Sequence, residues 1–86
     1  MNINELIAIV KNKLKTEIVT QDLKIEDKSF LHKNHKGHQE GKFHLKIIIK
    51  SNELAKSSKI DSTKRIYSIL DLELKEHIHS IQILLN

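Results

Sequence analysis

Three of the six histidines lie within seven residues, in the stretch HKNHKGH that contains His32, His35 and His38. Imidazole nitrogens are good ligands for zinc, copper and nickel. The residues alone leave three interpretations open. The cluster is a three-histidine metal site, a solvated polar loop with accidental spacing, or the source of one ligand in a site shared with a partner.

Two other histidines fall in segments with strand-like alternation. His44 alternates with Phe43 and Leu45, which places it on the polar face, as an ordinary polar strand residue. His79 has the phase of Ile81 and Ile83, so we expect it on the apolar face, either half-buried or, because it lies at the start of the strand, partly exposed. The last strand is expected to divide into one face with Ile81, Ile83 and Leu85, and another with Ile78, Ser80, Gln82 and Leu84.

Composition limits what such a site can be. The chain has 86 residues, so we expect one domain over residues 1–86. It has no cysteine, so any metal must be held by imidazole, carboxylate or a partner's ligands. No catalytic motif accompanies the histidines, although Glu40 and His44 are conceivable as an acid–base pair, and we expect a protein that is not an enzyme. No apolar run approaches the roughly 20 residues of a membrane span, and the N-terminus lacks signal-peptide features, so a cytoplasmic protein is expected.

Periodicity predicts a helix first and then two strands. Asn2 followed by Glu5 resembles a capping box ahead of an amphipathic helical stripe. Alternation predicts a strand at about 17–26 and a clearer strand that begins at Phe43. The segment 27–42 joins these strands and holds the histidine cluster.

The second half of the chain is expected to add a helix and a last strand. SNELAKSSK interrupts the second strand and is read as a short helical turn. The N-cap formers Asp61, Ser62 and Thr63 predict the start of a helix that ends near Lys75 or Glu76. The tail HIHSIQILLN alternates as a strand. We therefore predict an α+β two-layer sandwich of order αββ(α)αβ, with a three-stranded mixed sheet and helices on one face.

Several stretches together resemble the BolA family, over roughly Leu23 to Leu84. SFLHKNHKG resembles the family's loop motif S-H-x-H-x-x-H-x-G, and FHLKIIIKS is similar to its strand H-F-x-V-x-[IV]-x-S. RIYSILDLEL resembles the helix R-x-x-[IV]-Y-x-x-L-x-x-E-L. HIHSIQI matches the strand [IV]-H-A-L-x-[IL], which places His79 on the family's nearly invariant histidine. The family's R-H-R helix start is replaced by Ser62-Thr63-Lys64, and the usual Trp-bearing tail is absent.

The resemblance implies a type II KH-like fold and a heterodimer with a monothiol glutaredoxin. The two proteins would bridge a [2Fe–2S] cluster for iron–sulfur assembly, trafficking or iron sensing, with thiolates from glutaredoxin and glutathione on one side. His79 is the expected ligand on the other side, and His32 or His44 is the second candidate, with His35 as a weaker one. Imidazole ligation of one iron has a precedent in Rieske centres. No cluster is expected to stay bound to the chain alone, which we expect to be a monomer or weak homodimer.

The alternative function is a KH-like, DNA-binding transcriptional regulator with roles in stress responses, for which the family gives precedent. Lys64 and Arg65, at the start of the long helix, are the candidate nucleic-acid contacts. The formal charge is only +4, and Arg65 is the one arginine among fifteen basic residues. Arginine is the usual residue for bidentate phosphate and guanine contacts, so the composition gives this alternative little support.

Overall fold

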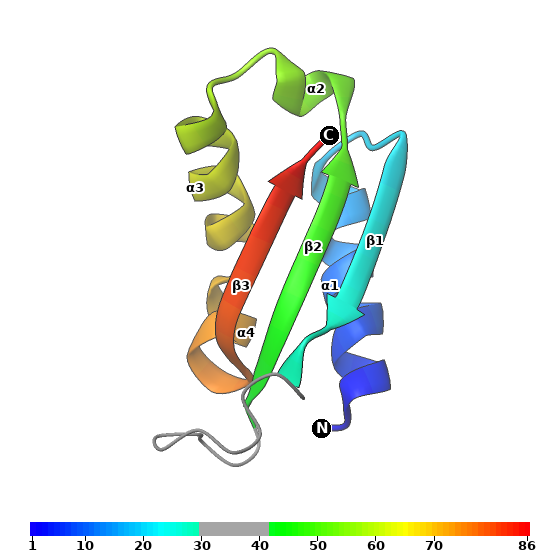
Figure 1. The fold of residues 1–86 in the computed structure, drawn as a ribbon, viewed down its shortest axis with the longest axis vertical. Helices are drawn as coiled ribbons and strands as arrows, with labels where there is room; N and C mark the ends of the chain where they lie inside the picture. Colours follow the sequence, from blue (N-terminus) through cyan, green and yellow to red (C-terminus); the bar gives the residue numbers. More distant parts are fainter. Residues whose placement is uncertain (30–41) are drawn as a thin grey trace.

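A three-stranded sheet backed by helices makes up the computed structural model, which describes residues 1–29 and 42–86. In Figure 1 the strands lie in front, α1 passes behind β1 and β2, and α4 lies behind the start of β3. The elements are α1 (Ile3–Glu17), β1 (Asp22–Asp27), β2 (Phe43–Lys50), α2 (Asn52–Ala55), α3 (Lys59–Ile69), α4 (Asp71–Glu76) and β3 (Ile78–Leu85). This architecture confirms the predicted α+β sandwich.

The central strand is β2, which pairs antiparallel with β1 and parallel with β3. Leu23 of β1 lies opposite Ile49, and Ile83 of β3 lies opposite Ile47. The parallel pair requires a crossover between the ends of the two strands, which α2, α3 and α4 provide. The core is lined by the buried residues Leu6, Val10, Leu14, Ile18, Leu23, Leu45, Ile47, Ile49, Leu54, Ile66, Leu70 and Ile78.

The first helix begins as predicted and ends later than predicted. Asn2 Oδ1 accepts a hydrogen bond from the backbone N–H of Glu5 at 2.8 Å, which caps the helix. We expected strand geometry from about residue 17, but α1 runs through Glu17 and β1 starts only at Asp22. Ile18 is the reason, because it lies four residues beyond Leu14 and continues the buried stripe of the helix at 1% exposure.

The predicted long helix is two helices, and it starts earlier than predicted. Ser58 is the N-cap of α3, since its Oγ accepts from the N–H of Asp61 at 3.1 Å. Ser62, expected among the N-cap residues, is instead buried inside the helix and donates to the carbonyl of Leu54 at 3.1 Å. The backbone leaves helical geometry at Leu70 and α4 follows directly. Because the apolar periodicity continues through Leu70, the pattern alone does not reveal the break.

An ion pair between a partly exposed lysine and a buried glutamate joins α1 to α4, the helix that leads into β3. Lys13 Nζ lies 2.7 Å from Glu73 Oε2, and the Glu73 side chain is only 5% exposed. The other oxygen, Oε1, has no hydrogen-bond partner within the residues that the structure describes. The positive charge of Lys13 therefore offsets most of the cost of keeping the Glu73 carboxylate away from water.

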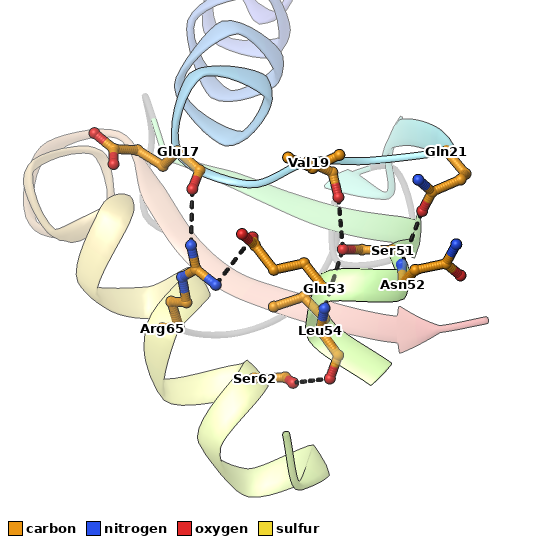
Figure 2. Close-up of polar contacts among 9 residues, drawn as sticks. All are labelled: Glu17, Val19, Gln21, Ser51, Asn52, Glu53, Leu54, Ser62 and Arg65. Carbon is orange, nitrogen blue, oxygen red and sulfur yellow. Dashed lines mark hydrogen bonds and ion pairs between the residues drawn. The ribbon is translucent and has the colours of Figure 1, made fainter. Parts of the chain in front are cut away.

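Arg65 connects three segments at the opposite end of the sheet (Figure 2). Its Nη2 donates to the carbonyl oxygen of Glu17 at 2.8 Å, and its Nη1 lies 3.1 Å from Glu53 Oε2. The first contact satisfies a carbonyl at the C-terminus of α1, which has no partner within the helix. One guanidinium thus ties α3 to the end of α1 and to α2.

Serine and glutamine side chains complete this junction (Figure 2). Ser51 Oγ donates to the carbonyl of Val19 at 2.7 Å and accepts from the N–H of Leu54 at 3.1 Å, which caps α2. Gln21 Oε1 accepts from the N–H of Asn52 at 2.8 Å. The turn after α1 is therefore fixed to the turn after β2.

Replacing Lys13 with alanine is expected to lower the free energy of unfolding by about 1–2 kcal/mol, since the buried Glu73 carboxylate loses its partner, while the partial exposure of Lys13 limits the loss. Urea denaturation measures the loss. Lys11→Ala, on the exposed side of the same helix, is the matched control and should cost about 0.5 kcal/mol or less. Adding Glu73→Gln to Lys13→Ala should recover part of the loss. Equal midpoints for the two lysine variants would contradict this role.

Arg65→Ala is expected to lower the free energy of unfolding by about 1–2 kcal/mol, because a helix-terminal carbonyl and Glu53 both lose their cationic partner. Lys64→Ala changes the neighbouring exposed lysine and should have little effect on stability. Thermal or urea unfolding of the two variants side by side gives the comparison. If both variants have the same unfolding midpoint as the unchanged protein, Arg65 does not stabilise the junction of α1, α2 and α3.

Candidate functional site: a histidine pair at the start of two parallel strands

His44 and His79 lie side by side, although 35 positions separate them in the sequence. Each is the second residue of its strand, and parallel pairing places the starts of β2 and β3 at the same end of the sheet. The two ring centroids are 4.8 Å apart, with the ring planes tilted by 55°. The structure therefore brings together two of the predicted ligands.

A shift in register between the strands orients His79. Phe43 pairs with Ile78, but the next residue, His44, pairs with Ser80, so His79 is the extra residue of a β-bulge. A bulge resets the alternation of a strand, and its two sides then follow different phases. Our expectation that Ile78 lies on the face opposite Ile81 is consequently wrong. Ile78 is buried at 2% exposure and packs in the core.

The same bulge changes the environment expected for His79. An unbroken alternation would place its side chain with Ile81 and Ile83 on the apolar face. Instead His79 is exposed, and its ring packs beside that of His44, whose strand neighbours Phe43 and Leu45 face the core. His79 is thus accessible to a binding partner and is not a half-buried core histidine.

His44 differs from the ordinary polar strand residue that was predicted, because it is only 7% exposed. Its Nδ1 lies 2.6 Å from Ser80 Oγ on the paired strand. Its backbone N–H donates to Ser29 Oγ at 3.0 Å, and its carbonyl accepts from the N–H of Lys28 at 2.7 Å. The imidazole of His44 is therefore held by β3, and its backbone by the segment that follows β1.

The spacing of the two rings fits the binding of one metal ion. A ligating imidazole nitrogen lies about 2.0–2.1 Å from the metal, and two rings on adjacent positions of one ion then have centroids roughly 5 Å apart. The observed 4.8 Å agrees with this geometry. Within 1–29 and 42–86, no group of three or more His, Cys, Asp or Glu residues could hold a metal. A metal ion at this pair would therefore need further ligands from outside the described residues.

A hollow of about 360 Å³ adjoins His44 but is not lined by His79; its lining residues are Lys28, His44, Leu45, Lys46, Ser80, Ile81 and Gln82. Two lysines at this hollow favour negatively charged groups such as thiolates or carboxylates. Glu26 offsets part of this charge, since its carboxylate lies 3.7 Å from Lys28 Nζ and its Cα is paired with that of Lys46. The surroundings of the histidine pair are therefore only mildly basic.

The remaining predicted site residues divide into two groups. His32 and His35 lie in the segment 30–41, outside the described residues, so their role as ligands stays a prediction. Lys64 is exposed on α3, whereas the guanidinium of Arg65 is engaged by Glu17 and Glu53 (Figure 2). Lys64 is therefore the better candidate of the two for a contact to nucleic acid.

The alternation pattern did not identify Ser80 as part of the site. A signal was present, because Ile78 and Ile81 are both apolar and three positions apart, which breaks a period of two. A bulge between two such residues would place both on the same face, as it does for Ile78 and Ile81. With the bulge at His79, Ser80 lies next to His44 in the paired strand.

Comparisons with known proteins agree with this fold and identify relatives. The family described as BolA-like protein matches residues 14–86. A protein of Haemophilus influenzae named DNA-binding transcriptional regulator BolA is 32% identical over 73 residues, which cover 85% of this chain and 68% of that protein.

No helix within the described ranges is long and apolar enough to cross a lipid bilayer.

Solved structures show the same architecture. The BolA domain of SufE1 from Arabidopsis thaliana superposes with a TM-score of 0.78 at 28% identity, over 92% of this chain and 87% of that one. BolA1 from Arabidopsis thaliana superposes with a TM-score of 0.76 at 24% identity, with the same coverage, and this likeness concerns the fold alone. Since the family match extends over most of the chain and the fold agrees, the chain belongs to the BolA family.

Proposed function

We propose that this chain is a non-enzymatic partner of a monothiol glutaredoxin and supplies histidine ligands to a [2Fe–2S] cluster shared by the two proteins. The observation that carries the proposal is the His44–His79 pair, with ring centroids 4.8 Å apart. Two imidazoles on one iron are the ligand set of a Rieske centre, where cysteines hold the other iron. This chain has no cysteine, so the thiolates must come from the partner and from glutathione.

The two histidines have different tasks in this proposal. His79 is exposed on a bulge at the end of the sheet, where an approaching protein can reach its ring. His44 is buried and fixed by Ser80, so it loses little conformational freedom when it binds. A bound cluster would supply electron-transfer or iron-donating chemistry, while the chain binds, orients and partly shields it.

Assembly of the heterodimer tests the first ligand. The chain is mixed with a monothiol glutaredoxin, ferrous iron, sulfide and glutathione, and the complex is isolated by size exclusion with visible absorbance and circular dichroism recorded. His79→Ala is expected to abolish the cluster-containing heterodimer, because it removes the accessible ligand. His77→Ala is the matched control, since His77 precedes the strand and lies 3.7 Å from Glu76. An unchanged spectrum and complex for His79→Ala would sink the assignment.

The second ligand is tested by comparing alanine variants of His44, His32 and His35 in the same assembly. We propose His44, because it is the imidazole beside His79 in the described structure. His44→Ala is then expected to alter the visible circular dichroism and shorten the lifetime of the cluster, whereas His32→Ala and His35→Ala leave both unchanged. The opposite result, with His32→Ala or His35→Ala giving the loss, would move the second ligand to the loop.

Duplex DNA binding is the second candidate function, favoured by the relative from Haemophilus influenzae, which is named as a DNA-binding transcriptional regulator. Lys64 is exposed on α3 and suits a phosphate contact, whereas the guanidinium of Arg65 already contacts Glu17 and Glu53. Such binding would depend on lysine and therefore on phosphate charge more than on base sequence.

Fluorescence anisotropy with a labelled duplex at about 50 and 200 mM salt measures this binding, and affinity should fall with salt. If the regulator role holds, Lys64→Ala weakens binding and reduces the salt slope by about one, while Lys11→Ala on α1 does not. Equal affinities for Lys64→Ala and the unchanged protein exclude this contact.

A further inference from the structure

The two edge strands of the sheet, β1 and β3, differ in charge. β1 (DLKIED) contains Asp22, Lys24, Glu26 and Asp27, and charged residues on an edge strand discourage further strands from pairing with it. β3 (IHSIQILL) is eight residues long and contains no proline and no Asp, Glu, Lys or Arg. Among the described residues, no strand pairs with the outer side of β3. That side is therefore open to pairing with another uncharged strand.

Alternate residues of β3 direct their backbone groups to this outer edge. The N–H of Asn86 donates to a carbonyl of β2 at 2.9 Å, and successive residues of a strand direct their N–H and C=O groups to opposite sides. The residues at odd positions, Ile81, Ile83 and Leu85, therefore face outward. Tyr67 of α3 agrees with this direction, since its hydroxyl lies 3.5 Å from the carbonyl of Ile81. At that distance the hydrogen bond is weak, so it protects the edge little.

The apolar core is also incompletely covered along β3. Ile47 of β2 is fully buried, whereas its partner Ile83 is only partly buried, as are Ile81 and Leu85. In Figure 1, β3 lies on the same side of the molecule as α3 and α4. These three elements carry most of the large apolar side chains that are exposed in the described ranges, namely Ile60, Tyr67, Leu72 and Leu84. Apolar surface of this kind marks an interaction site.

We propose that β3 pairs antiparallel with β3 of a second copy of this chain, with the two-fold axis at Ile83, so that the two sheets become continuous. The axis passes through Ile83 because the three outward residues are centred on it. Ile83 then lies opposite its copy, and Ile81 lies opposite Leu85. On the other face of the sheet, Gln82 lies opposite Leu84.

Charge and symmetry favour a second copy as the occupant of this edge. The chain has a formal charge of +4, so two copies repel each other unless they meet through an uncharged surface, which β3 provides. A two-fold axis makes the same strand serve on both sides, and the partly buried residues of each core-facing side then cover those of the other. The interface does not include His79, so it is independent of the proposed function.

Sedimentation equilibrium of the full chain measures the self-association. The expected result is a reversible equilibrium, in which the apparent mass rises with protein concentration from 10.0 kDa toward twice that value. The mass of a single chain at every concentration up to the solubility limit overturns the proposal.

Two charge variants at exposed positions of β3 test the pairing itself. Gln82→Lys combined with Leu84→Lys brings introduced lysines face to face across the axis, so the dissociation constant of the dimer should rise about tenfold. Gln82→Lys combined with Leu84→Glu brings opposite charges together at the same positions and should restore the dimer. Both side chains are exposed, so the fold is expected to tolerate both variants, which circular dichroism checks. A dimer that the paired lysines do not weaken, or that both variants weaken equally, overturns the pairing.

Amide hydrogen exchange locates the interface residue by residue. The N–H groups of Ile81, Ile83 and Leu85 should exchange more slowly as protein concentration rises, because they find a hydrogen-bond acceptor only in the dimer. The N–H of Ile25, which faces the outer edge of β1 by the same alternation, is the internal control and should keep its rate. Slowing of the three β3 amides only after a monothiol glutaredoxin is added would assign this edge to that protein and overturn the pairing of two copies.

Discussion

Parallel pairing of β2 with β3, with its register shifted at the first residues, is the constraint on which the site depends. Parallel strands begin at the same end of a sheet, so the second residues of the two strands, His44 and His79, lie close together. The shift then determines which side chains face each other across the pair. With this shift, Ser80 is paired with His44 and His79 is the extra residue of β3.

The helix layer fixes where β3 begins. Its last helix, α4, is tied to α1 through Lys13 and Glu73, and the N–H of His77 donates to the carbonyl of Glu73 at 2.8 Å as the helix ends. The carbonyl of His77 then accepts from the N–H of Phe43 at 2.9 Å, at the first residue of β2. A short chain of contacts thus runs from the helix layer to the histidine pair, and the site rests on rigid elements.

Local signals in the sequence predicted much of the fold correctly. The cap at Asn2 and the alternation through β2 depend on residues close together in the chain, and both appear in the structure. The boundaries at Ile18 and Ser62 were predicted wrongly because tertiary burial decided them, Ile18 by extending the stripe of α1 and Ser62 by bonding to Leu54. The resemblance to the BolA family indicated His79, but the bulge that turns it to His44 interrupts the periodicity used to assign its face. His32 lies outside the described residues.

Pulsed electron paramagnetic resonance of the reduced complex tests the central claim most directly. With ¹⁵N-histidine incorporated only into this chain, the account predicts two inequivalent, strongly coupled ¹⁵N nuclei at the cluster, one of which disappears in His79→Ala. Absence of any strongly coupled nitrogen from this chain in an intact, reduced complex would contradict ligation by the histidine pair.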